Sequence, residues 1–289
     1  MQGELVFTTT SDHVRLHGFY LHSTAQLATS PVVGSVDAAV LVHGLGGNFY
    51  SSRMLLHFAK TLTDLGISVV VVNSRGHDMI NTSTWAGRSR SLGAAMENVA
   101  DATFDLTAWA DFLVERGHRN VLMVGHSLGA IKTLYAQANA AHPKVRATIC
   151  LSAARLSYAK LIASERGSLF RETYARCEAM VANSRGDEPI HVQFPYPTWM
   201  TSACYIDKYG PDEKFNWLTF VDKIEVPTLL VFGQKELDQD LAFDGLRPQL
   251  ETLKNGWNAL DIEEIEDADH FYTAKFAAVD EQLVRWLTR

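Results

Sequence analysis

The chain has 289 residues, of which 47% are hydrophobic and 20% charged, so it can bury a large α/β core, as one domain or as a domain with an insertion. Its formal net charge of -7 provides no basic surface for nucleic acid or an anionic membrane, so we expect a small-molecule substrate as its partner. The three cysteines, Cys150, Cys177 and Cys204, are odd in number and widely spaced, which argues against a disulfide framework and a structural zinc site.

The first residues and the longest apolar runs indicate where the protein resides. Residues 1–6 lack the basic and apolar regions of a secretion signal, and no uncharged run is long enough to span a bilayer. These features predict a cytoplasmic protein without membrane contact, although a secreted form whose signal has been removed stays open. A homodimer is also compatible with the sequence.

The first third of the chain contains short apolar segments typical of strands. Residues 4–9 and 13–22 flank the turn-like Ser11 and Asp12, which predicts a β-hairpin, and a polar linker covers residues 23–35. Strands and helices then alternate, as in a parallel sheet with crossover helices. The expected elements are a strand at 38–42, a helix at 51–65, a strand at 67–72, a helix at 96–116 and a strand at 120–124.

The predicted helix at 96–116 has one apolar stripe, formed by residues such as Val99, Leu106 and Leu113 at spacings that place them on one face. We interpret its acidic residues as a solvated face and as residues favoured near a helix start, and not as a metal site. These residues are Glu97, Asp101, Asp105 and Asp111.

The segment from Val121 to Gly129 is the most informative motif, because an apolar strand runs directly into Gly-His-Ser-Leu-Gly and then into a helix at 130–141. A serine on such a tight turn sits in a strained conformation, and its neighbours on either side must lack bulk. Ser127 is therefore the candidate nucleophile. His126 is expected to line the site or to pack beneath it.

A strand at 145–151 follows, and the next strand lies at 226–232. A structureless loop between them would be improbably long, so residues 155–225 are expected to fold as a helical cap. The chain then closes with a helix at 239–254, a strand at 260–265 and a helix at 273–287. The cap carries many aromatic side chains, some for its own core and some for an apolar pocket. They are Tyr158, Phe170, Tyr174, Phe194, Tyr196, Trp199, Tyr205, Tyr209, Phe215, Trp217 and Phe220.

This order of elements resembles the α/β-hydrolase superfamily over nearly the whole chain. Four local patterns support the resemblance: residues 43–47 (His-Gly-Leu-Gly-Gly), residues 73–77 (Asn-Ser-Arg-Gly-His), the turn at Ser127, and residues 267–270 (Asp-Ala-Asp-His). The resemblance implies a mostly parallel central sheet with helices on both faces. The core would comprise residues 1–154 and 226–289, and the cap residues 155–225.

The resemblance also implies roles for particular residues. His270 would be the general base, and an acid near residues 236–240 would orient it. The usual family pattern places this acid at Glu236, with Asp238 as the alternative and Asp240 as a weaker one. The backbone N–H groups of Leu45 and Leu128 would form the oxyanion hole.

A dinucleotide-binding loop is the rival interpretation of the glycine-rich residues 44–49, but Phe49 stands where the last glycine of that fingerprint is required. We therefore expect no cofactor and no metal. Arg75 and Asp78 are expected to stabilise their own loop and not to contact the substrate.

Together with the candidate residues, the resemblance implies a serine hydrolase that cleaves a carboxylic ester, lactone or thioester of a small to medium apolar substrate. A C–C bond hydrolase, an amidase or an acyltransferase could use the same three residues. A ligand receptor without catalytic activity is the alternative from a different class.

Overall fold

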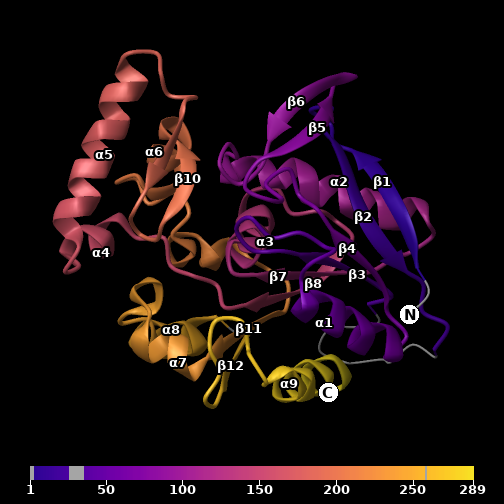
Figure 1. Cartoon of the computed structure of the whole chain (residues 1–289). Coiled ribbons are helices and arrows are strands. Elements are labelled where there is room, and N and C mark those ends of the chain that lie inside the picture. Colours follow the sequence, from indigo (N-terminus) through magenta and orange to yellow (C-terminus); the bar gives the residue numbers. More distant parts are fainter. Residues whose placement is uncertain (1–2, 26–35, 258) are drawn as a thin grey trace.

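The computed structural model describes residues 3–25, 36–257 and 259–289, so most of the predicted linker at 23–35 lies outside the described residues (Figure 1). One large sheet forms the centre of the molecule. Its first two strands are antiparallel to their neighbours and the others are parallel. The strand order is β1 (Glu4–Thr9), β2 (Arg15–Leu21), β4 (Ser68–Val72), β3 (Ala38–Val42), β7 (Val121–His126), β8 (Val145–Leu151), β11 (Thr228–Gly233) and β12 (Leu260–Ile265).

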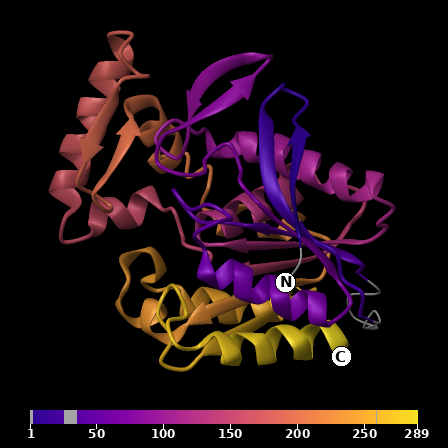
Figure 2. The same cartoon turned by 45° about the vertical axis from the view of Figure 1, so that its right-hand side comes forward.

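Helices cover both faces of this sheet, as the resemblance implied (Figures 1 and 2). The strands are buried on both sides because consecutive side chains belong to different cores: Val69 and Val71 pack on one face, and Val70 and Val72 on the other. Helices α1 (Arg53–Asp64) and α9 (Phe276–Thr288) cover the first face. The second face is covered by α2 (Ala102–Glu115), α3 (Leu128–Asn139) and α8 (Arg247–Gly256).

Several predicted boundaries are wrong. The helix predicted at 96–116 starts with a single 3-10 turn, η1 (Val99–Asp101), and continues as α2. The helix predicted at 239–254 is the short turn η4 (Leu241–Phe243) followed by α8, and a separate helix, α7 (Gln234–Gln239), ends where the prediction begins. The last helix begins at Phe276 and not at residue 273, since Ala274 has a positive φ of 57° that interrupts a helix.

A β-hairpin was missed between β4 and α2. It consists of β5 (Asn81–Trp85) and β6 (Arg88–Leu92), joined at Gly87, which has a φ of +75°. Its strands are mostly polar and have little apolar alternation to reveal them. The hairpin attaches to the main sheet through a bridge between Val14 and Trp85.

The interpretation of the acidic residues at 97–111 as a solvated face is wrong for two of them. Glu97 and Asp105 are buried. Glu97 pairs with Lys132 of α3, and Asp105 pairs with Arg75 from the loop after β4. Each of these cations comes from another element, so spacing within a single helix gives no sign of the pairing.

The predicted cap segment contains helices and also a hairpin that was not predicted. Its elements have their own aromatic core, which includes Phe170, Tyr174 and Tyr205, and they lie to one side of the sheet (Figures 1 and 2). They are α4 (Tyr158–Ala163), α5 (Gly167–Ala182), β9 (Pro189–Val192), β10 (Thr198–Thr201) and α6 (Ser202–Tyr209).

The end of this segment packs differently. Phe215, Trp217 and Val221, in and around the short turns η2 (Trp217–Thr219) and η3 (Val221–Lys223), join the core formed with α3. A further link between the segment and the core is the backbone bond from the Thr201 N–H to the Ala95 carbonyl, at 2.8 Å. The segment is thus held at its hairpin as well as at its ends.

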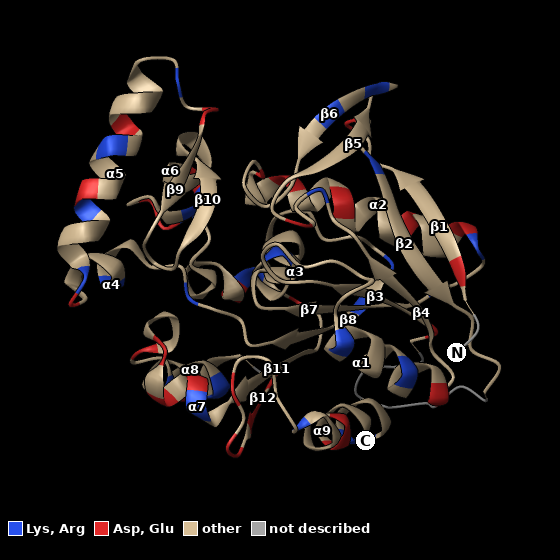
Figure 3. Cartoon of the chain, in the orientation of Figure 1, with Lys and Arg blue, Asp and Glu red and all other residues tan. Residues whose placement is uncertain are grey.

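Charged residues of both signs alternate along the outer helix α5 (Figure 3). Within the described residues, none of the helices combines the length and the apolar character that crossing a membrane would require.

Candidate active site

Three side chains predicted to act together meet at the carboxyl edge of the sheet. Ser127 follows β7, Glu236 lies in α7 directly after β11, and His270 follows β12. The carboxyl ends of parallel strands share one edge, so residues distant in sequence come together there. His270 Nε2 lies 2.9 Å from Ser127 Oγ, and its Nδ1 lies 2.7 Å from Glu236 Oε2. The result is a continuous chain of hydrogen bonds from carboxylate to hydroxyl.

The turn at Ser127 has the strain that the sequence predicted. Its φ is 54°, a left-handed conformation that is costly for a residue other than glycine. The flanking glycines are required by packing: a Cβ on Gly125 would lie 2.3 Å from the Gly129 carbonyl oxygen, and one on Gly129 would lie 2.5 Å from the carbonyl oxygen of Val42. The turn therefore holds the hydroxyl of Ser127 outward, toward His270.

Glu236 is almost completely buried, with 1% exposure, and its second oxygen is also occupied. Oε1 accepts hydrogen bonds from the Gly233 N–H at 2.7 Å and from the Ser152 hydroxyl at 2.8 Å. Ser152 in turn lies 2.9 Å from the hydroxyl of Tyr272. Sequence reasoning missed Ser152 and Tyr272, because neither belongs to a motif.

The two alternative acids lie elsewhere. Asp238 is exposed and pairs with Arg247, which also binds Glu264 at 2.7 Å. Asp240 lines a cavity beside Ser127, and among the hydrogen bonds of the described chain its side chain has none to His270. Of the three candidates, only Glu236 contacts the imidazole.

The loop that carries His270 is fixed on both sides of the ring. Asp269 Oδ1 accepts from the N–H groups of Phe271 and Thr273, at 3.0 and 2.9 Å. The carbonyl of His270 lies 2.8 Å from His126 Nε2. Burial, with a smaller contribution from His270, lowers the pKa of His126 to about 3, so this ring is neutral and donates its Nε2–H. His126 is almost completely buried, and it lines the cleft beside Ser127, one of the two places expected for it.

The loop after β3 lies directly against the serine. A Cβ on Gly44 would be 3.1 Å from Ser127 Cβ, so the backbone at residues 43–45 approaches the hydroxyl closely. Leu45 and Leu128 both line the cavity that contains Ser127. Their backbone N–H groups donate to no acceptor within the part of the chain that the structure describes. Two amides are therefore available beside the serine.

A buried polar chain supports this loop from behind. Lys132 Nζ lies 2.6 Å from Glu97 and 3.3 Å from the hydroxyl of Ser74, and Ser74 donates its N–H to His43 Nε2 at 3.2 Å. The other nitrogen of His43 lies 2.7 Å from the Gly44 carbonyl. Burial and the nearby Lys132 lower the pKa of His43 to about 4, so it is neutral.

Sequence reasoning missed this chain too. The available signal was Lys132 itself, a lysine on the apolar side of α3 between Ile131 and Leu134, where a cation needs a buried partner. Arg75 and Asp78 lie as expected: Arg75 binds Asp12 and Asp105, and Asp78 accepts from Asn48 and Tyr50.

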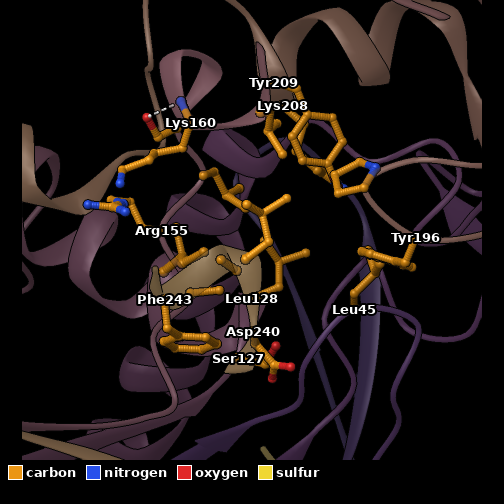
Figure 4. Close-up of a pocket in the computed structure, with 18 of the residues that line it drawn as sticks. Leu45, Ser127, Leu128, Arg155, Lys160, Tyr196, Lys208, Tyr209, Asp240 and Phe243 are labelled. Carbon is orange, nitrogen blue, oxygen red and sulfur yellow. Dashed lines mark hydrogen bonds between the residues drawn. The ribbon is translucent and has the colours of Figure 1, made fainter. Parts of the chain in front are cut away.

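Two cavities meet at Ser127. The first, of about 370 Å³, lies beneath the predicted cap and is largely apolar; we call it the cap cavity (Figure 4). The second is a wider cleft of about 1100 Å³ that runs toward α1 and the start of α9. Leu45, Ser127, Tyr196 and His270 line both. Of the predicted cap aromatics, Tyr196 and Tyr209 line the cap cavity, whereas most of the others form the cores described above.

Within the described ranges, no three or more His, Cys, Asp or Glu side chains are grouped so that they could hold a metal ion. The glycine-rich loop at 44–47 packs against Ser127 and His43.

A mostly parallel sheet, covered by helices on both faces and carrying a serine on a strand-to-helix turn, defines the class of α/β hydrolases. The family model described as the alpha/beta hydrolase family matches residues 39–280. The chain belongs to this family, which supports a hydrolase activity. A search of curated protein sequences gives no match.

Solved structures show the same fold over nearly the whole chain. The α/β hydrolase GrgF from Penicillium sp. sh18 aligns with a TM-score of 0.68 at 16% identity, covering 99% of this chain and 97% of that one. Est1E from Butyrivibrio proteoclasticus, with ferulic acid bound, gives 0.65 at 16% identity and covers 97% of each chain. The esterase domain of a Rhodothermus marinus protein gives 0.60 at 18% identity, covering 100% and 99%. Identities this low establish the fold alone.

Proposed function

We propose that the chain is a serine hydrolase that cleaves a carboxylic ester, lactone or thioester of a small to medium, largely apolar substrate. The observation that carries this proposal is the unbroken set of hydrogen bonds from Glu236 through His270 to Ser127, at 2.7 and 2.9 Å. A hydroxyl is a weak nucleophile until a neighbouring base can take its proton. Here that base is already within reach.

In the proposed reaction, Ser127 Oγ attacks the carbonyl carbon while His270 Nε2 takes the hydroxyl proton. Glu236 Oε2 accepts from the Nδ1–H of His270, which holds the ring in the required tautomer and stabilises the imidazolium. His270 then gives the proton to the departing alcohol or thiol, and the acyl group remains on Ser127. Water, deprotonated by the same imidazole, releases the acid and restores the serine.

Negative charge forms on the carbonyl oxygen during each attack. We assign its stabilisation to the N–H groups of Leu45 and Leu128, since neither donates elsewhere in the described chain and both residues line the cavity at Ser127. Fixed donors of this kind typically contribute about a hundredfold to a thousandfold to kcat. Because they are backbone groups, side-chain substitution leaves them in place.

The two cavities suggest where the two parts of the substrate bind. The cap cavity would receive one side of the ester and the wider cleft the other, with the carbonyl at Ser127 between them. We also propose residues 155–225 as a cap on a core of residues 1–154 and 226–289. The packing of Trp217 against the core favours an earlier end for the cap, after α6. The esterases among the similar folds are consistent with ester chemistry.

The first test compares the wild type with Ser127→Ala on p-nitrophenyl esters of increasing acyl length, with circular dichroism to check that both are folded. We expect turnover in the wild type and a loss of about a thousandfold or more in the variant. Labelling of the wild type by a fluorophosphonate, absent in Ser127→Ala, would show the reactive serine independently of the substrate.

The outcomes separate the alternatives. A folded wild type that is labelled but cleaves no ester would favour an amidase, an acyltransferase or a C–C bond hydrolase, which use the same residues. A wild type that is neither labelled nor active would overturn the enzyme assignment in favour of a ligand receptor.

A further inference from the structure

Two buried cationic side chains that line the cap cavity have nitrogen atoms without partners. Lys208 of α6 is 3% exposed, and its Nζ has no hydrogen bond in the described chain. Arg155, just after β8, is 5% exposed, and its Nε also lacks an acceptor. Both line the same cavity as Ser127 (Figure 4). A buried ammonium without a partner is costly, so its presence needs an explanation.

No carboxylate of the described chain forms a hydrogen bond with Lys208. Glu97 is the carboxylate that acts most strongly on Lys208, but its Oε2 is paired with Lys132 at 2.6 Å, and its buried Oε1 has no hydrogen bond in the described chain. Lys208, Glu97 and Lys132 together carry one excess positive charge. Burial lowers the pKa of Lys208, and Glu97 only partly opposes this. The two outer nitrogens of the Arg155 guanidinium donate hydrogen bonds to Gln249 Oε1 and to the Asp244 carbonyl, whereas Nε has no acceptor in the described chain.

The rest of the lining indicates what kind of ligand would fit. Lys160 is a third cation, half-exposed and paired with Asp244 at 2.7 Å, whereas Asp240 is the acid among the lining residues. Between these groups and Ser127 the wall is mostly apolar, formed by Leu128, Ile131, Leu156, Leu161, Leu241 and Phe243. The cavity therefore matches an apolar chain that ends in an oxygen acceptor of negative charge.

We propose that the cap cavity is a carboxylate subsite: the substrate is an ester or thioester whose apolar chain ends in a carboxylate, which Lys208 binds and to which Arg155 offers a second donor. This inference rests on the proposed function, because it names the class of substrate for the same serine. The substrate carboxylate would supply the acceptor that Lys208 Nζ and Arg155 Nε lack. When the apolar chain of the substrate has the matching length, this contact would place the ester carbonyl at Ser127.

The experiment uses pairs of esters that differ only in the terminal group. p-Nitrophenyl monoesters of dicarboxylic acids, from adipic to sebacic acid, are compared with esters of the monocarboxylic acids of equal length. A second series places the carboxylate in the alcohol part, as acetates of hydroxy acids and of the matching alcohols. Wild type, Lys208→Met and Lys208→Gln are assayed beside Lys254→Met, which removes an exposed lysine of α8 outside the cavity.

In at least one series we expect kcat/KM to be about tenfold or more higher for the carboxylate ester at a particular chain length. Lys208→Met should lower the ratio of kcat/KM between the carboxylate ester and the neutral ester to about one. Circular dichroism checks that the variant is folded. Lys208→Gln, which keeps a donor without the charge, should fall between. Lys254→Met should behave as wild type.

Other results would overturn the subsite. A wild type that prefers the neutral ester at every length in both series excludes it. Equal losses on both esters in Lys208→Met would show that Lys208 serves Glu97 and the fold. If no ester is cleaved, the proposed function fails by itself, and calorimetry then tests the subsite separately. Tighter binding of suberate than of octanoate by the wild type, lost in Lys208→Met, supports the subsite. Equal binding of the two acids refutes it.

Discussion

Glu236→Gln tests the arrangement of the acid and the imidazole most directly. The amide oxygen of glutamine can replace Oε1, which accepts from the Gly233 N–H at 2.7 Å and from Ser152 at 2.8 Å. The amide NH2 then faces His270 Nδ1, where the wild type has an acceptor at 2.7 Å. Two donors cannot share this contact, so the ring must carry its proton on Nε2 instead.

A proton on Nε2 removes the base from Ser127, because that nitrogen lies 2.9 Å from the hydroxyl it should deprotonate. Loss of the correct tautomer in a site of this kind costs about four powers of ten in kcat, which corresponds to about 5 kcal/mol of transition-state stabilisation. The substrate still fits its cavities, so KM should change little. Stability should also change little, since size and two hydrogen bonds are kept.

Asp238→Asn is the matched control. Its side chain is 49% exposed and pairs with Arg247, which keeps Glu264 as a second partner. Exposed pairs contribute about 1 kcal/mol or less, so both kcat and the free energy of unfolding should stay close to wild type. Steady-state kinetics on the best ester and urea denaturation measure both quantities. Full activity in Glu236→Gln, or an equal loss in Asp238→Asn, would refute the assignment of the acid.

Two further predictions concern the buried groups. Lys132→Met should lower the free energy of unfolding by about 3 to 5 kcal/mol, because it leaves the carboxylate of Glu97 buried without its partner; the double variant with Glu97→Gln should recover part of this in urea denaturation, and a neutral single variant would contradict the pairing. The free energy of unfolding should also fall as the pH drops below about 6.5. The pKa values of His126 and His43 in the folded chain, about 3 and about 4, lie below the pKa of an unfolded histidine. The unfolded chain therefore binds protons at these two rings that the folded chain does not bind. At pH 5 the loss is about 2 kcal/mol for each ring, and His126→Gln should remove one share of it; an unchanged pH dependence would contradict the burial argument.

Much of the fold and of the candidate site follows from local sequence. The turn at Ser127 is readable because its two glycines lie close to the serine in the sequence, and one of them, Gly125, is required by a contact within the motif itself, with Gly129. The parallel sheet is readable because its strands are buried on both sides and consist almost entirely of apolar residues, as in Ser68–Val72. Each of these two signals is contained in a short stretch of consecutive residues.

The parts that were missed depend on contacts between distant segments. Ser152, after β8, reaches Glu236, after the neighbouring strand β11, and Lys132 of α3 reaches Glu97 in the loop before η1. Nothing near Glu97 in the sequence distinguishes it from a solvated acid. The hairpins β5–β6 and β9–β10 were missed for a related reason, since short and partly polar strands are defined by their pairing with each other more than by periodicity.

The bond between the Thr201 N–H and the Ala95 carbonyl has a consequence for protein engineering. It attaches the β9–β10 hairpin to Ala95, which lies two residues before Glu97 in the sequence. Glu97 contacts Lys132, Lys132 contacts Ser74, and Ser74 contacts His43. An insertion transplanted from another hydrolase would therefore disturb more than the substrate cavity, because it would also have to rebuild this anchorage. Chimeras that keep residues 198–208 together with residues 93–98 should retain the rigidity of the glycine-rich loop, whereas grafts that separate the two would start from a loosened one.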